Sequence, residues 1–302
     1  MTLTYFKLFS TAFFWGGTFV AGRWLGESVH PYSSAFFRFA VASLFLLMLT
    51  CRREGRLPKL TPRQMLAVLA LGATGVFAYN LFFFNGLQHV HASRAALIIA
   101  LNPTAITLAS ALLYKEKLEM RRALGILLAL CGAVMVITRG NPLTVFDGGI
   151  GRGELLIFGC VVSWTLYSII GKKAMQGLTP LAAVSWSSLA GTALLLFPAL
   201  THGSFSEALG FGIGAWGSIV YLGLFGTVIG FFWYFEAIQK IGPSRAAVFI
   251  NFVPVNGVLL ATLLLGEPLT FAVLSGGSMV ICGSYLANST ARKHLTRPFA
   301  ET

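Results

Sequence analysis

Long apolar segments alternate with short polar gaps along the whole chain. The apolar segments are residues 4–25, 33–51, 64–87, 92–114, 121–138, 153–175, 180–200, 213–239, 243–265 and 269–287. Each holds about 18 residues or more, the length that a helix needs to cross the hydrocarbon layer of a bilayer. The segments do not alternate in polarity as transmembrane β-strands do. The pattern therefore predicts an all-α integral membrane protein with ten transmembrane helices.

Composition supports lipid, rather than water, as the solvent of most of the surface. Of the 302 residues, 56% are hydrophobic and 11% are charged, and the mean hydropathy is +0.77. A soluble domain of this size usually carries about 25% charged residues. One globular core could not bury so large an apolar surplus.

The formal net charge of +12 could indicate a nucleic-acid partner, but the basic residues lie in the gaps between apolar segments. With a cytoplasmic N-terminus, 17 Lys and Arg residues fall on the cytoplasmic side. Four fall on the opposite side: Arg23, Arg94, Arg139 and Arg152. An excess of positive charge marks the cytoplasmic side of a membrane protein. We therefore expect both termini in the cytoplasm and no nucleic-acid partner.

The chain also matches itself at two offsets. At an offset of 149, Trp15, Gly22, Arg23 and Pro31 align with Trp164, Gly171, Lys172 and Pro180. At an offset of 151, Ser93–Ala96, Pro103, Glu116, Gly125 and Gly132 align with Ser244–Ala247, Pro254, Glu267, Gly276 and Gly283. Such an ordered set of matches indicates an internal repeat.

The repeat has a consequence for topology. Each repeat holds five predicted helices, so the second one enters the membrane from the opposite face. We therefore expect two inverted five-helix repeats around a central cavity, an arrangement typical of alternating access. The expected domains are a first repeat at 1–140, a linker at 141–152, a second repeat at 153–290 and a cytoplasmic tail at 291–302.

These motifs resemble those of a known family. They are Phe14–Gly16, Pro31 with Arg38, and the duplicated pattern from Ser93 to Gly132. By these motifs, the chain resembles the drug/metabolite transporter superfamily over essentially its whole length, and specifically the EamA-type ten-helix members of that superfamily. The resemblance implies export of amino acids or related metabolites across a bacterial inner membrane. Within the superfamily, the chain is most similar to the aromatic amino-acid exporters.

Two prolines near the middle of the fourth and ninth predicted helices are candidates for helix breaks and gating. Pro103 and Pro254 cannot donate a backbone hydrogen bond, and an interrupted helix can present polar backbone to a cavity. Asn102 and Asn251 lie beside them and could bind the amino and carboxylate groups of a zwitterion. The alternative is a plain kink, with the asparagines bonded to neighbouring helices.

Aromatic residues form a second group of candidates. The ones selected for substrate binding are Trp15, Tyr79, Phe83, Trp164, Trp186 and Tyr234. An aromatic cavity would accept a bulky apolar group by stacking and burial. The alternative is an interfacial belt or packing against lipid.

Charged residues inside a membrane are rare and functional by default. Arg38 lies about two helical turns into the second segment and could attract a substrate carboxylate, yet it is close enough to the outer interface for an entrance or structural role. Glu116 and Glu267 lie at segment ends, where we expect ion pairs with nearby Lys or Arg. No Asp or Glu lies at mid-membrane, which favours facilitated diffusion and leaves other forms of coupling open.

We expect an exporter of aromatic or large neutral amino acids, or of related small metabolites. The alternative is a broad-specificity drug or metabolite efflux carrier driven by a proton gradient. The sequence has no His-Glu-x-x-His motif, serine–base pair or paired carboxylates, so we expect no enzymatic activity. Its four cysteines lack metal-ligand spacing, and we expect no metal or cofactor. The expected partners are a small-molecule substrate and the lipid bilayer, and the expected state is a monomer or weak homo-oligomer.

Overall fold

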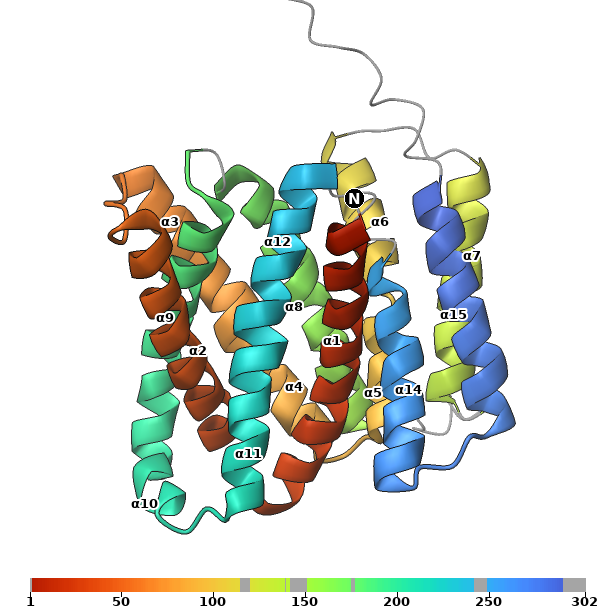
Figure 1. Cartoon of the computed structure of the whole chain (residues 1–302). Coiled ribbons are helices and arrows are strands. Elements are labelled where there is room, and N and C mark those ends of the chain that lie inside the picture. Colours follow the sequence, from red (N-terminus) through yellow and green to blue (C-terminus); the bar gives the residue numbers. More distant parts are fainter. Residues whose placement is uncertain are drawn as a thin grey trace, which may run out of the picture.

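The computed structural model describes residues 2–114, 120–138, 140–141, 151–174, 177–241 and 249–289. These residues form helices and connecting turns, with no strand among them (Figure 1). The helices are α1 (Thr2–Ser28), α2 (Pro31–Glu54), α3 (Pro62–Leu71), η1 (Gly72–Ala78), α4 (Tyr79–Leu87), α5 (Ala92–Ile99), α6 (Asn102–Tyr114), α7 (Met120–Ile137), α8 (Arg152–Ala174), α9 (Pro180–His202), α10 (Ser204–Ala208), α11 (Ile213–Tyr221), η3 (Leu222–Ile229), α12 (Gly230–Ile241), α14 (Phe252–Leu265) and α15 (Phe271–Ser289). The expectation of an all-α protein is confirmed for this part of the chain.

Five helical segments are long and apolar enough to cross a membrane. They are Pro31–Glu54, Pro62–Leu87, Arg152–Gly171, Pro180–His202 and Ile213–Ala237. Four shorter apolar helices accompany them: Ala92–Ile106, Ala123–Ile137, Phe252–Leu265 and Phe271–Ala287. Helix α1 has 27 residues but is not among the five. The five segments match five of the ten predicted crossings, and the other five crossings stay predictions.

Several helices begin where the sequence supplies a cap. Thr61 accepts a hydrogen bond from the backbone N–H of Gln64, whose side chain accepts one from the backbone N–H of Thr61. Thr179 caps α9 in the same way through the N–H of Ala182, directly before Pro180. A side-chain acceptor pairs one of the N–H groups that a helix start leaves unbonded, and proline in the first turn has no N–H to lose. These residues set the helix boundaries.

Two of the long segments contain a π-helical stretch in the middle. η1 joins α3 to α4, and η3 joins α11 to α12. Gly75 of η1 and Gly226 of η3 are 151 residues apart, which is the offset of the sequence repeat. π-Helical turns are rare and frequently lie at functional sites. They also rotate the residues that follow relative to a regular α-helix.

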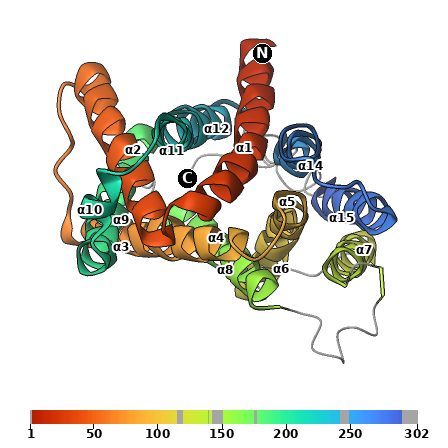
Figure 2. The same cartoon turned by 90° about the horizontal axis from the view of Figure 1, so that it is seen from below.

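Helices α7 and α15 pack with their backbones in contact, at the edge of the molecule away from α2, α3 and α9 (Figures 1 and 2). A Cβ atom placed on Gly283 would lie 2.4 Å from the backbone nitrogen of Ala129, and one on Gly125 would lie 2.4 Å from that of Ala287. Only glycine allows such an approach. Small residues serve membrane helix packing in this way.

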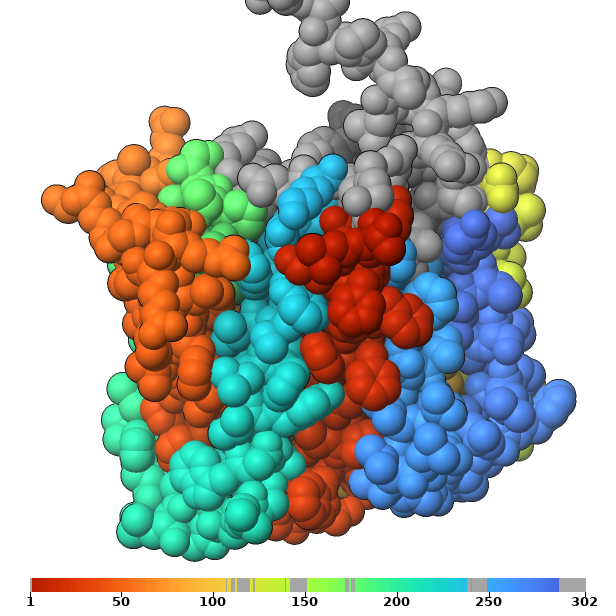
Figure 3. All heavy atoms as spheres, in the orientation of Figure 1, coloured from red at the N-terminus to blue at the C-terminus, as the bar shows by residue number. Residues whose placement is uncertain are grey.

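Large apolar side chains cover the outer surface. The exposed ones on α1, α11, η3 and α14 include Phe9, Phe13, Trp24, Val220, Phe225, Val255, Leu259 and Leu263. Figure 3 shows the side of the molecule on which α1, α11 and α14 lie. A soluble monomer rarely exposes so continuous an apolar surface. Acyl chains of a bilayer would cover it without cost.

Buried carboxylates tie the start of α5 to two other segments. Glu267 accepts hydrogen bonds from the backbone N–H groups of Ala92 and Ser93, at 2.7 and 2.9 Å. The nearby Arg94 pairs with Glu154 of α8 at 2.6 Å. Among the described residues, the partners of Glu267 are the N-terminus of α5, whose first N–H groups lack partners within the helix, and His91 at 3.6 Å. The expected ion pair of Glu267 with Lys or Arg stays a prediction. Glu116 lies outside the described residues.

A polar cluster joins the start of α2 to the end of α9 and to α10. The rings of His30 and His202 stack with centroids 3.5 Å apart. Glu207 accepts a hydrogen bond from the backbone N–H of His30 at 2.8 Å and another from the hydroxyl of Ser33. Burial and the neighbouring His202 lower the pKa of His30, and Glu207 partly offsets that shift.

The contact between α7 and α15 predicts strong sensitivity to added volume. We expect Gly283→Val to lower the free energy of unfolding by at least about 2 kcal/mol, because the new atoms meet backbone that cannot move aside. Thermal unfolding of the purified protein in detergent measures the effect. The control is Gly217→Val in α11, where an added Cβ meets nothing within 4 Å. Equal Tm values for the two variants would contradict this packing.

The His30 cluster predicts a pH effect on stability. A lowered pKa means that folded His30 resists protonation, so the unfolded chain binds more protons as the pH falls through the usual histidine value of about 6.5. We therefore expect the Tm to fall from pH 7.5 to pH 5.5. The side chain of His30 caps α2 by accepting a hydrogen bond from the backbone N–H of Tyr32. His30→Asn keeps such an acceptor but does not titrate, so it should weaken the pH dependence of the Tm. The same substitution at the exposed His89 should leave the dependence unchanged, and a weakening there would contradict the assignment.

Candidate binding cavity

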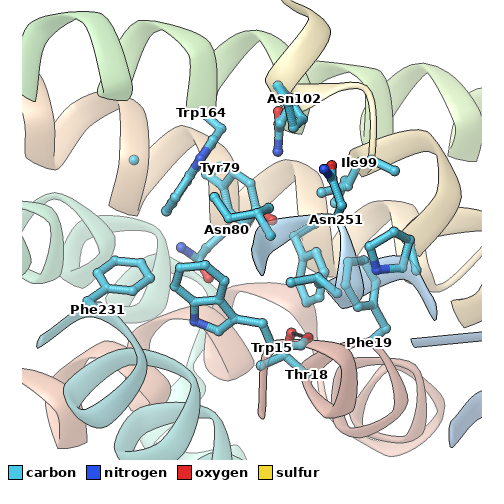
Figure 4. Close-up of a pocket in the computed structure, with 18 of the residues that line it drawn as sticks. Trp15, Thr18, Phe19, Tyr79, Asn80, Ile99, Asn102, Trp164, Phe231 and Asn251 are labelled. Atoms are coloured by element: carbon cyan, nitrogen blue, oxygen red, sulfur yellow. Dashed lines mark hydrogen bonds between the residues drawn. The ribbon is translucent and has the colours of Figure 1, made fainter. Parts of the chain in front are cut away.

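A cavity lies among the central helices, bordered by α1, α2, η1, α4, α5, α6, α8, α12, α14 and α15 (Figure 4). It is lined by Trp15, Thr18, Phe19, Arg38, Phe39, Gly75, Tyr79, Asn80, Phe83, Ala96, Ile99, Ala100, Asn102, Pro103, Trp164, Phe231, Ile250, Asn251, Val253, Pro254 and Ile281. Its empty space is about 820 Å³ when open solvent at the mouth is included. A mostly apolar lining with a few polar groups is typical of small-molecule sites.

Aromatic rings form one wall of this cavity. The ring of Trp164 lies 6.3 Å from that of Trp15, 5.6 Å from that of Tyr79 and 5.6 Å from that of Phe231, measured between centroids. The contacts with Trp15 and Phe231 are edge to face, which is a favourable geometry for aromatic pairs. Figure 4 shows the four side chains around the same space. A flat apolar group could stack within this wall.

The π-helical segments contact Trp15 of this wall and Tyr167, which packs against the wall. The indole N–H of Trp15 donates to the backbone carbonyl of Gly226 in η3, at 2.8 Å. In η1, a Cβ atom on Gly75 would lie 2.1 Å from the ring of Tyr167, which itself packs against Trp164 at 5.2 Å. Each π-helical segment therefore offers bare glycine backbone to an aromatic side chain from another helix.

Arg38 brings positive charge to the cavity. Its side chain is buried, with 6% of the residue exposed. One terminal nitrogen donates to Oδ1 of Asn80 at 3.0 Å, and the other to the hydroxyl of Thr227 at 3.4 Å. The expectation of an entrance or structural charge stays a prediction. Its hydrogen bonds hold the side chain between α2, α4 and η3.

Two helix breaks border the cavity. Helix α5 ends at Ile99 and α6 starts at Asn102, so Pro103 lies in the first turn of α6. Likewise Asn251 directly precedes α14, with Pro254 in its first turn. Proline is well tolerated there because first-turn N–H groups have no partner within the helix. Figure 4 shows the side chains of Asn102 and Asn251 beside the cavity.

The structure brings together most of the residues selected from the sequence. Nine of them line the cavity: Trp15, Arg38, Tyr79, Phe83, Asn102, Pro103, Trp164, Asn251 and Pro254. Their roles in binding and gating stay predictions.

Two selected residues lie elsewhere. Trp186 donates its indole N–H to the carbonyl of Pro58 at 3.1 Å and packs near Val68 and Leu178. Tyr234 packs behind Trp15, at a centroid distance of 5.3 Å. Neither lines the cavity, so we leave both out of the proposed site. Trp186 is bonded to the loop before α3, and Tyr234 packs against the cluster of Leu8 and Ala237.

The sequence selection also missed several residues of the lining. Asn80 is fully buried and bonded to Arg38, and Phe231 completes the aromatic wall. Asn80 carried a usable signal, because a polar side chain within a long apolar segment is unusual. Phe231 carried no such signal, since it lies in a run of aromatic residues of similar character.

Comparisons with known proteins match this chain to transporters over most of its length. The model of the EamA-like transporter family matches residues 2–138 and 151–289. The uncharacterized transporter YyaM of Bacillus subtilis is 29% identical, covering 95% of this chain and 94% of its own. A probable terminal-alkyne amino-acid exporter of Streptantibioticus cattleyicolor is 28% identical, covering 83% of this chain and 82% of its own. The fold is also similar to that of a solved crystal structure, with a TM-score of 0.65 and 21% sequence identity. The match covers 97% of this chain and 99% of the other chain.

Proposed function

The chain belongs to the EamA-like transporter family of membrane proteins, and we propose that it exports aromatic or large neutral amino acids, or related small metabolites, across a bacterial inner membrane. Transport of a small molecule is the activity of the family. The substrate, the alternating-access mechanism and the cytoplasmic placement of both termini are our proposal. The observation that carries it is the central cavity with its aromatic wall.

The chemistry of the cavity supports this substrate class. Trp15, Tyr79, Trp164 and Phe231 offer flat apolar surface on which a bulky side chain would lose contact with water, at a gain of about 1.5–3 kcal/mol for a fully buried group. Polar amide groups of the two helix breaks border the same space. The similarity to a probable amino-acid exporter points in the same direction.

Contacts between equivalent positions of the sequence repeat support two inverted halves. The hydroxyls of Ser43 and Thr192 are 2.9 Å apart and 149 residues apart in sequence. Trp15 and Trp164, which are also 149 apart, meet in the cavity wall. A residue that touches its own equivalent lies close to a two-fold axis. Such an axis would relate two gates on opposite sides of one site, as alternating access requires.

The charges around the cavity favour facilitated diffusion over proton-driven efflux of cationic drugs. Among the described lining residues there is no Asp or Glu. A proton-coupled carrier usually needs a titratable acid within the membrane, and a cationic drug would need an opposite charge in the cavity. The proton-driven efflux carrier therefore stays the second candidate.

Reconstitution into liposomes tests the proposed function. We expect labelled phenylalanine and leucine to enter vesicles that contain the protein faster than lysine or glutamate, because the apolar wall matches only the first two side chains. In addition, no described lining residue is an acid that could pair with the ammonium group of the lysine side chain. The rates should not change when a proton gradient is imposed. If no amino acid moves faster than in empty liposomes, the proposed substrate class is wrong. A rate that follows the gradient would instead overturn facilitated diffusion.

Two tryptophan variants test the position of the site. We expect Trp164→Ala to reduce phenylalanine transport roughly tenfold or more, because it removes ring surface from the cavity wall. Trp186→Ala removes the same side chain outside the cavity and should leave the transport rate of folded protein within about twofold of the unmodified rate. Rates are normalised to folded protein by size-exclusion chromatography. Equal losses in both variants would contradict a site at Trp164.

A further inference from the structure

Arg38 is a buried cation whose hydrogen-bond partners among the described residues are neutral. It is 6% exposed, and its two hydrogen-bond partners, Asn80 and Thr227, are both neutral. No Asp or Glu lies within ion-pair distance of Arg38 in the described part of the chain. Burying an arginine side chain without a counter-charge costs several kcal/mol. Arginine cannot avoid this cost by losing its proton.

The neighbours of Arg38 leave part of its hydrogen-bonding capacity unused. A guanidinium group has five N–H donors. The side-chain N–H₂ of Asn80 donates to the carbonyl of Val76 at 2.7 Å, which turns its oxygen toward Arg38. The hydroxyl of Thr227 donates to the carbonyl of Leu222 at 3.1 Å and so keeps a lone pair for Arg38. The Nε–H of Arg38 is fully buried and has no partner among the described residues.

The guanidinium also lies next to the aromatic wall. A Cβ atom on Gly226 would be 3.6 Å from a terminal nitrogen of Arg38, and the carbonyl of the same glycine holds the indole of Trp15. Asn80, which binds Arg38, directly follows Tyr79 and lines the same cavity. One small molecule can therefore reach the cation and the aromatic rings together.

We propose that Arg38 is the specificity-determining residue that binds a carboxylate of the substrate. This inference rests on the proposed function and deepens it: the solute carries a carboxylate at Arg38 and its apolar group against Trp15, Tyr79 and Trp164. The carboxylate supplies the missing counter-charge and accepts the unused N–H groups, in the geometry that arginine favours for carboxylates. The cavity then selects apolar carboxylates over amines and over uncharged amides of the same shape.

The competing interpretation is that Arg38 only ties α2 to α4 and η3 through Asn80 and Thr227. A structural tie would lower stability when removed, and would affect charged and uncharged ligands to the same extent. A carboxylate site would instead change the preference between them. The preference, rather than the absolute affinity, therefore separates the two roles.

A binding assay with two matched probes tests the proposal without requiring transport. The probes are phenylpropionate and its uncharged amide, which have the same ring and chain and lack an ammonium group. Binding to the full chain in detergent is measured at pH 7.5 by quenching of tryptophan fluorescence, and independently by isothermal calorimetry. We expect the unmodified protein to bind the carboxylate at least about tenfold more tightly than the amide, as for a charge-assisted hydrogen bond. Equal affinities, or no binding of either probe, would overturn the proposal.

Variants of two arginines assign the preference to one residue. Arg38→Gln should bring the two affinities to within about twofold of each other, mainly by weakening the binding of phenylpropionate. Arg38→Lys should retain part of the preference for the carboxylate over the amide. The matched control is Arg23→Gln, since Arg23 donates to the carbonyl of Leu87 outside the cavity, and its preference should be unchanged. If Arg38→Gln does not fold, the lysine variant decides: a preference as large as that of the unmodified protein would overturn the assignment. A preference that survives in both Arg38 variants would overturn the assignment.

The outcome is separable from that of the proposed function. If amino acids cross the liposome membrane but the unmodified protein binds the carboxylate and the amide equally, the function stands and the role of Arg38 fails. If the carboxylate preference depends on Arg38 but no amino acid is transported, the anion site stands and the amino-acid substrate fails.

Discussion

A backbone inside a bilayer must find all of its hydrogen bonds within the protein, because lipid offers none. That constraint explains why every described segment of this chain is helical or a short connection between helices. It also explains where helices are interrupted. The breaks before Pro103 and Pro254 and the π-helical segments η1 and η3 all border or support the central cavity, so irregular backbone occurs where protein surrounds it.

Glycine turns the same constraint into close packing. At Gly125 and Gly283 the backbones of α7 and α15 touch, and no side chain could be added to either without moving a helix. In the π-helical segments, glycine has a different use: Gly226 exposes a carbonyl to the indole of Trp15, and Gly75 receives the ring of Tyr167. Glycine in the π-helical segments therefore contacts Trp15 of the aromatic wall and Tyr167, which packs against Trp164.

Among the buried charged side chains of the described structure, Glu154 and Glu267 have strong partners, whereas those of Arg38 are neutral. Glu267 is paired with the N-terminus of α5 and Arg94 with Glu154, and both interactions satisfy a charge that would otherwise be costly to bury. Arg38 has only neutral acceptors within the described structure. On our proposal, the cavity keeps one charge incompletely satisfied so that the solute completes it, and the aromatic wall supplies the remaining contacts.

The sequence by itself determined the helical character, five of the membrane-spanning segments and the residues around the helix breaks, because apolar length and proline position can be read along one dimension. The repeat offsets also predicted which residues correspond between the two halves. Only the tertiary structure decided which side chains face the cavity. Phe231 lines it while Tyr234 and Trp186 do not, although all three lie in apolar segments. The physical reason is that the facing direction depends on rotation about each helix axis. That rotation is fixed by packing between helices, and for α12 the preceding η3 also shifts it away from the regular α-helical period.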